Sequence, residues 1–196
     1  MYNCVIFNFY ENMLSKILSL LILQMNDYLK LRFRLREDIV FASPPVKDTV
    51  SSFPANRISI SIINLEKENM GGIPHSQQAV AGSLSKKTAV TWQINAYLLV
   101  AAVFLEKQYS ESVQLLSGAL SFLQKNNQYS VANSSKKLTT EVVNMSFQEL
   151  SNLWSVCGGS YYPSVICKVR GIEIDESEIV DFSGVISQHD VNPEIK

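Results

Sequence analysis

This chain of 196 residues has few cysteines and histidines, and its formal net charge is close to zero. The cysteines Cys4, Cys157 and Cys167 form an odd set without paired spacing, which predicts a reducing compartment and argues against a disulfide framework. A zinc site needs four N, S or O ligands, but the chain adds only His75 and His189 and has no CxxC or HxxxH motif. We therefore predict neither a metal site nor a cofactor.

The near-zero net charge argues against nucleic acid as a partner. The formal net charge is -1, whereas proteins that bind the phosphate backbone carry clustered Lys and Arg. The one dense basic run consists of Lys30, Arg32, Arg34 and Arg36, which alternate with apolar residues. This pattern favours a solvated edge of an amphipathic segment over a phosphate site.

Long apolar runs are also missing. The run Ile17–Leu23 is too short for a membrane span, which needs about 20 residues. Polar residues flank it, and it predicts a buried helix that continues to Phe33, with no direct membrane insertion. Residues 1–12 are read as an N-terminal extension to a domain that begins at Met13.

Alternating apolar residues predict two strands in the first half of the chain. Ile58, Ile60 and Ile62 alternate with serines, and even-numbered residues between Val90 and Phe104 are apolar. The stretch Leu98–Leu105 is apolar on both sides, which fits either a doubly covered central strand or a subunit contact. A short strand at Ile39–Phe41 stays open. Residues 67–88, rich in Gly and polar residues, are read as a mobile insertion loop at a hairpin tip.

A helix and a strand are predicted next. Ser110 can cap the helix, and Val113, Leu116, Leu120 and Leu123 form its expected apolar face. The strand covers residues 138–143.

The stretch from Leu138 to Ile174 has the clearest signals for where its helix and strands begin and end. Ser146 and Glu149 form an S-x-x-E capping box at a helix start. Phe147 and Trp154, at helical spacing with Leu150 and Leu153, are predicted to anchor this helix on a sheet. Gly158, Gly159 and Pro163 end it, and the alternating residues Val165, Cys167 and Val169 predict a last strand.

The order of these elements predicts an α+β fold. The expected architecture for residues 13–174 is a single domain with one mixed β-sheet, covered by an N-terminal helix and two further helices. Residues 175–196 form a C-terminal arm.

The sequence contains no recognisable catalytic motif. A serine with His75 or His189 and Asp190 forms a triad on paper, but each histidine lies in a predicted loop or tail. Gly71–Gly72 and Gly158–Gly159 lack the lysine of a phosphate-binding loop. We predict no catalytic residue and no enzyme, with a Cys or Ser hydrolase as the remote alternative.

Several segments together resemble a known family. They are VNMSFQELSNLW at Val143–Trp154, Gly158–Val165 with Lys168–Arg170, MNDYLKLRF at Met25–Phe33, and ISIINLEKE at Ile60–Glu68. The chain resembles the cap, or tail-terminator, proteins of phage-tail-like contractile injection systems, related to antifeeding prophages and type VI secretion.

The resemblance implies a structural role. Such proteins form a six-fold ring at the distal end of the inner tube and sheath, stop polymer growth and stabilise the extended sheath. It implies a homohexamer, contacts with the terminal sheath and inner-tube subunits, and a cytoplasmic location during assembly as part of the injection particle. The alternative is another ring-forming tube or baseplate component without a terminating role.

Two segments are candidates for subunit contacts. Tyr161 and Tyr162 follow the double glycine, where loop aromatics are enriched at interfaces, although both could instead cover the sheet end. The arm is too apolar for a solvated tail and is expected to dock on a neighbouring cap subunit or on the terminal sheath ring, or else to fold back on its own sheet. Its candidate contact residues are Ile179, Val180, Phe182, Val185 and Ile186.

Overall fold

The apolar run near the N-terminus lies in a long helix, α1 (Met13–Phe33), as predicted. Its buried residues include Ile17, Leu21, Met25 and Leu29, each four residues from the next, so they form one stripe along the helix. In the part of the chain that the structure describes, no helix is long and apolar enough to cross a membrane.

The computed structural model describes residues 13–45, 54–68, 92–130 and 137–174. The N-terminal extension, nearly all of the insertion loop and the C-terminal arm lie outside the described residues. So do the candidate arm contacts, Cys4 and both histidines.

Within the described residues, six strands form one sheet in the order β1-β2-β3-β6-β5-β4. β1 pairs with β2 in parallel and every other pair is antiparallel, so the sheet is mixed and the predicted α+β class is confirmed. The strands are β1 (Val40–Ala42), β2 (Arg57–Lys67), β3 (Trp92–Val103), β4 (Gln128–Ser130), β5 (Lys137–Val143) and β6 (Ser164–Ile174).

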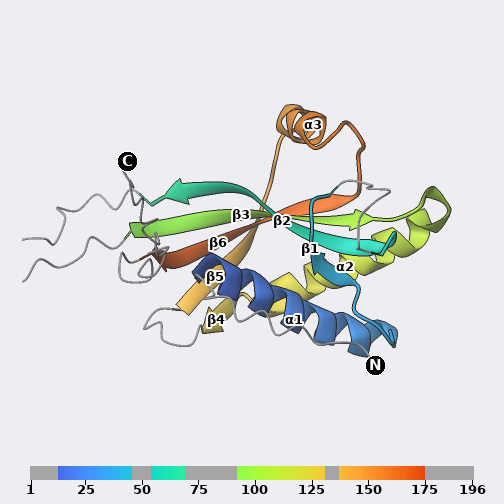
Figure 1. Cartoon of the computed structure of the whole chain (residues 1–196), viewed down its shortest axis with the longest axis horizontal. Helices are drawn as coiled ribbons and strands as arrows, with labels where there is room; N and C mark the ends of the chain where they lie inside the picture. Colours follow the sequence, from blue (N-terminus) through green and yellow to red (C-terminus); the bar gives the residue numbers. More distant parts are fainter. Residues whose placement is uncertain (1–12, 46–53, 69–91, 131–136, 175–196) are drawn as a thin grey trace, which may run out of the picture.

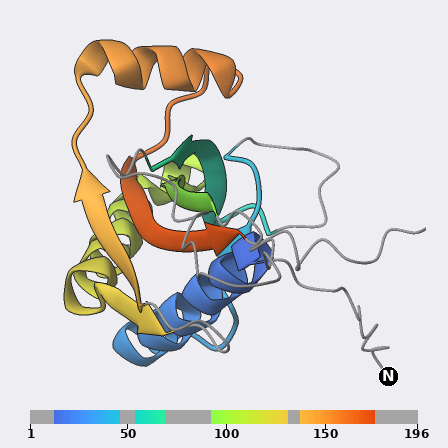
Figure 2. The ribbon, with the colours of Figure 1, turned by 90° about the vertical axis from the view of Figure 1, so that its left-hand side faces the viewer.

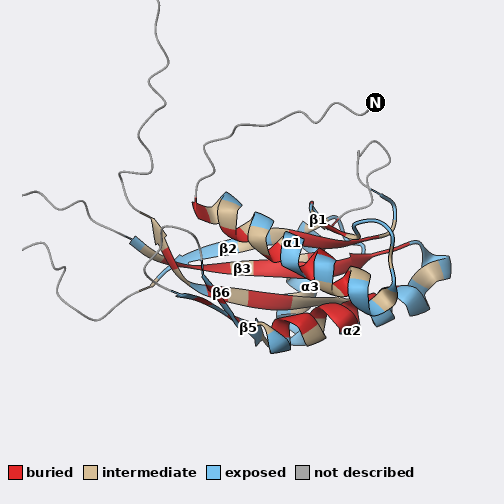
Figure 3. Cartoon of the chain, turned by 90° about the horizontal axis from the view of Figure 1, so that it is seen from below, coloured by how far each residue is buried: buried red, intermediate tan, exposed pale blue. Residues whose placement is uncertain are grey.

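The central position of β3 resolves the question raised by its two apolar sides. β3 lies between β2 and β6, and its second half is buried on both faces (Figure 3). Leu98 and Val100 belong to the core under α1, whereas Leu99 and Ala101 belong to a smaller core on the opposite face. The doubly covered central strand is confirmed.

The helices divide unequally between the two faces. α1 and α2 (Tyr109–Lys125), which follows the short 3-10 helix η1 (Glu106–Gln108), cover one face, and α3 (Phe147–Val156) covers the other (Figure 1). In the side view α3 stands on the far side of the sheet from α1 (Figure 2).

Two predictions for α2 are wrong. Ser110 does not cap the helix, because η1 leads directly into it and Gln108 is the N-cap residue, whose side chain makes no capping hydrogen bond. Val113 is 39% exposed. Leu116 and Leu123 are buried as predicted, and the buried face also includes Leu115, Ala119 and Phe122. This face brings the small residues of α2 against α1.

A buried amide joins α1 to the outermost strand. The Asn26 Nδ2 donates to the Val40 carbonyl at 2.9 Å, and its Oδ1 accepts from the backbone N–H groups of Ile39 and Val40, also at 2.9 Å. All these groups are buried or partly buried, so the side chain acts as a partner for β1 on the side that no described strand occupies.

Candidate subunit interface

The capping box predicted at the start of α3 is present. The Glu149 carboxylate accepts from the Ser146 N–H and the Ser146 hydroxyl, each at 2.8 Å, and the Glu149 N–H donates to the Ser146 hydroxyl oxygen at 3.3 Å. These hydrogen bonds lower the pKa of Glu149. Because the helix start is satisfied locally, α3 depends little on the sheet for its backbone hydrogen bonds.

Trp154 is the residue that ties α3 to the sheet. It is 4% exposed, and its ring lies 5.8 Å from Tyr161 and 5.7 Å from Tyr162, both edge-on. It shares a core with Leu99 and Ile166 of the sheet. The predicted burial of Trp154 is confirmed.

The prediction that Phe147 anchors the same helix is wrong, because its side chain is 93% exposed. Leu150, Leu153 and Cys157 pack against the smaller core with Trp154, and the centre of that face lies about 70° around the helix from Phe147 at 100° per residue. Phe147 also opens the helix, where the chain has not yet reached the sheet. An apolar side chain in water is therefore left at the start of α3.

The two tyrosines after α3 have different environments. Tyr162 is buried in the smaller core, so it covers the sheet in the way the alternative interpretation stated. Tyr161 is 61% exposed and lines a hollow of about 290 Å³, together with Leu105 and Tyr109. Its role at an interface stays a prediction.

Beyond α3 the same face of the sheet is polar. Lys168 Nζ donates to the Tyr97 hydroxyl at 2.8 Å, and that hydroxyl donates to Glu66 Oε2 at 2.8 Å. The hydrogen bond to Tyr97 raises the pKa of Lys168. Arg170 pairs with Glu141 on the next strand. This half of the face carries charge that can orient a partner but offers little apolar area.

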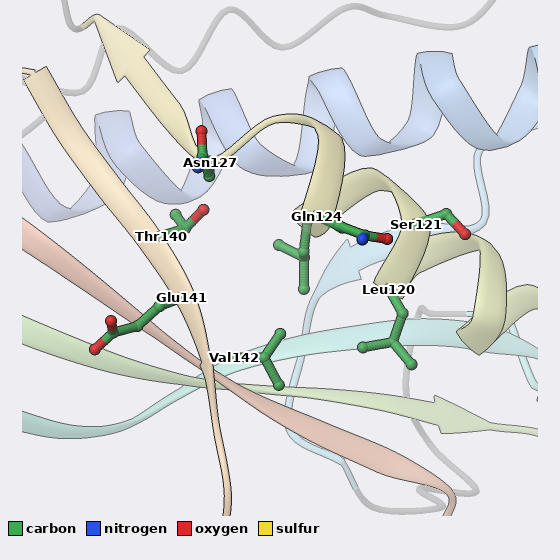
Figure 4. A pocket seen from close by; sticks show the side chains of 8 residues that line it. Leu120, Ser121, Gln124, Asn127, Thr140, Glu141 and Val142 are labelled. Atoms are coloured by element: carbon green, nitrogen blue, oxygen red, sulfur yellow. The ribbon is translucent and has the colours of Figure 1, made fainter.

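A groove lies on the opposite face, between α2 and the second half of β5 (Figure 4). It has a volume of about 460 Å³. Side chains of Leu120, Ser121 and Gln124 come from α2, and those of Thr140 and Val142 come from β5. Sequence reasoning missed this groove, because it depends on β4 being only three residues long.

The described residues hold little that resembles a catalytic centre. Burial raises the pKa of the Cys167 thiol to about 12, and burial also raises that of Cys157, so both favour the unreactive thiol form. No group of three or more His, Cys, Asp or Glu residues in the described ranges could hold a metal ion. The triad residues His75, His189 and Asp190 lie outside them.

The basic run at the end of α1 is solvated, as predicted. Lys30 pairs with Asp38 at 2.6 Å, and Arg32, Arg34 and Arg36 are exposed. Part of the charge of this basic run is therefore already paired with a neighbouring carboxylate.

Known proteins resemble this chain over most of its length. Residues 16–188 match the family described as the Pvc16 N-terminal domain, and the chain belongs to this family. No curated protein matches the chain.

Two solved structures share the fold. One is the sheath/tube terminator of the extracellular contractile injection system PVC in its extended state, with 16% identity, a TM-score of 0.53, and coverage of 89% of this chain and 65% of that one. The other is the tube-terminating cap of the anti-feeding prophage, with 18% identity, a TM-score of 0.50, and coverage of 78% and 52%. The chain thus spans less than two thirds of either structure.

Proposed function

We propose that this protein is the structural cap of a contractile injection system. In this role it forms a ring at the distal end of the tail, stops growth of the tube and sheath, and stabilises the extended sheath. The observation that carries the proposal is membership of the Pvc16 N-terminal domain family over residues 16–188. The shared fold with a sheath/tube terminator and a tube-terminating cap supports it.

Growth would stop by geometry rather than by chemistry. A ring that presents one complementary surface to the last polymer layer, and no equivalent surface to another layer, ends a head-to-tail assembly. A sheet with a well-packed face and a sparsely covered face suits this task, because one side can hold the fold while the other side and the edges make contacts. The raised pKa values of Cys157 and Cys167 fit a non-enzymatic role.

The subunit number and partners are part of the proposal. The resemblance to tail-terminator proteins favours a homohexamer that contacts the terminal sheath and inner-tube subunits within the particle. Native mass spectrometry of the purified full chain should then give a species of six times its 22.0 kDa mass. A protein that stays monomeric at tens of micromolar, and that builds no ring on particles, contradicts the ring.

Deletion of the gene tests the terminating role. Without the ring, particles should show tubes or sheaths of abnormal length, or sheaths that contract early, and a plasmid copy should restore normal particles. Uniform extended particles of normal length and yield would refute the proposal. A complete loss of particles would instead favour the alternative, a tube or baseplate component that is needed to start assembly.

A further inference from the structure

The second half of β5 is an uncovered sheet edge. β4 pairs only with residues 137–139, and the Thr140 N–H donates outward to the Asn127 carbonyl at 2.9 Å. Since successive backbone groups of a strand alternate in direction, the N–H and C=O of Val142 also point outward. No described strand lies beside them, whereas Glu141 and Val143 pair with β6 on the inner side.

The groove beside this edge can receive side chains. Val142 and Leu120 line it with apolar surface, and Ser121 and Gln124 add polar groups from α2 (Figure 4). Val142 is 46% exposed. A strand that binds an open edge gains main-chain hydrogen bonds, and pockets for alternate side chains give specificity. The β5 edge and its groove supply both.

The other side of the sheet is less suited to a new strand. β1 lies beside the start of β2 and is itself bound by Asn26. The rest of β2 carries a bulge between Ile62 and Asn64, followed by exposed Asn64, Glu66 and Lys67. Bulges and charges are devices that keep an edge from pairing.

We propose that the β5 edge at Glu141–Val143 binds residues 179–186 of a neighbouring copy as an added antiparallel strand. This inference rests on the proposed ring. The arm segment has the required pattern, because Val180 and Phe182 alternate with Asp181 and Ser183. The family match extends to residue 188, so this segment belongs to the family's domain.

The length of the chain favours a neighbouring copy over the same chain. A strand antiparallel to β5 runs in the direction of β6 and starts level with Ile166, the partner of Val143. Ile174, where the arm leaves β6, lies eight residues further along, or ~26 Å. The connection from Ile174 to Ile179 spans at most ~18 Å. An added strand that begins with Ile179 therefore cannot start opposite Val143 of its own chain in this orientation.

The arrangement gives each subunit one arm and one groove. Such a contact is heterologous, since different surfaces meet, and it generates a ring when the rotation between neighbours closes. The arm would then set the direction in which subunits follow one another around the cap.

Complementary variants of the full chain test the exchange. Leu120→Glu places a charge in the groove, and Phe182→Asp removes the largest apolar side chain of the arm. Gln114→Glu, on the exposed side of α2, is the matched control for added charge. Each test variant alone should lose at least tenfold in the fraction assembled by native mass spectrometry, while the control should assemble like the wild type.

An equimolar mixture of the two test variants gives the decisive reading. The Leu120→Glu variant keeps an intact arm, and the Phe182→Asp variant keeps an intact groove. The mixture should therefore form heterodimers that neither variant forms alone. Wild-type ring formation by either variant, or a mixture without heterodimers, would overturn the inference. If the variants formed normal rings that failed to cap particles, the groove would bind a sheath or tube segment instead.

Circular dichroism and thermal melting check that the variants fold. If Leu120→Glu unfolds, Val142→Pro replaces it, because proline removes only an outward-facing donor at an edge. The proposed function fails separately, when the wild-type chain itself forms no ring and its deletion leaves normal particles.

Discussion

On one face of the sheet, α1 and α2 bury side chains along almost their whole length, whereas on the other face α3 buries Trp154 alone among its residues. α3 nevertheless begins with a capping box, which α2 lacks. The difference lies in what they contact. Local signals decide whether a helix forms, and packing decides whether it holds the fold together. The α1/α2 face therefore carries stability, and the α3 face leaves apolar groups available to partners.

The largest expected difference in the free energy of unfolding is between Phe→Ala substitutions on the two faces of the sheet. Phe122 of α2 is 2% exposed and Phe147 of α3 is 93% exposed. Phe122→Ala should lower the free energy of unfolding by ~3–5 kcal/mol, because it opens a cavity in the main core. Phe147→Ala should change it by less than ~0.5 kcal/mol. Urea denaturation measures both, and similar losses would show that the two faces do not differ in this way.

Trp154→Ala should cost ~3 kcal/mol, with most of the effect confined to α3. The ring is the main contact between this helix and the sheet, so its removal should free α3 while β3 and β6 remain folded. Hydrogen exchange should show lost protection at residues 147–156 and retained protection in both strands. If protection fell equally throughout the chain, α3 would be part of the main cooperative unit.

The pH dependence of stability sharpens the comparison at Cys167, which lies in the main core. Burial raises its pKa from 9.0 to about 12, so the unfolded state loses the proton first as pH rises. The stabilisation is complete below pH 9 and is lost progressively toward pH 12. At pH 10 the loss relative to Cys167→Val should be about 1 kcal/mol. Parallel stability curves for the two proteins between pH 8 and about 10.5 would exclude this contribution.

The smallest effect concerns the contact between α1 and α2. A Cβ at Gly118 would lie 2.6 Å from Phe33 Cε2 and 2.8 Å from Leu29 Cδ2. Overpacking of this kind costs ~1–3 kcal/mol, and the better helix propensity of alanine offsets ~1 kcal/mol. Gly118→Ala should therefore lose about 1 kcal/mol in the same denaturation assay. The exposed control Ser117→Ala should stay near the wild type, and a gain for Gly118→Ala would mean that the helices can separate freely.

Strong periodicity made the core elements predictable. The alternation around Ile58–Ile62 and Leu98–Leu105 identified β2 and β3, and the apolar run at Ile17–Leu23 identified α1. The helix buries one stripe of residues and β3 is buried on both sides, so each pattern can be recognised within a short stretch of sequence. The capping box at Ser146 was predictable for the same reason, because its hydrogen bonds are local.

The candidate contacts were less predictable, because they depend on where elements end relative to one another. Nothing near Phe147 in the sequence shows that α3 begins before the chain meets the sheet. β4 was missed because a strand of three residues after Asn126–Asn127 resembles a turn. The groove at Leu120 and Val142 follows from that short strand, so it depends on contacts between residues far apart in the sequence.

The Asn26 amide has a consequence for the order of folding. It joins groups only 13 and 14 residues apart, so the loop that it closes is short and its entropic cost is small. α1 and β1 can thus associate as soon as both have left the ribosome, before the rest of the sheet is synthesised. β2 would then add to a template that already exists. In pulsed-labelling experiments, the Val40 amide should become protected before those of β3, and Asn26→Ala should abolish that early step.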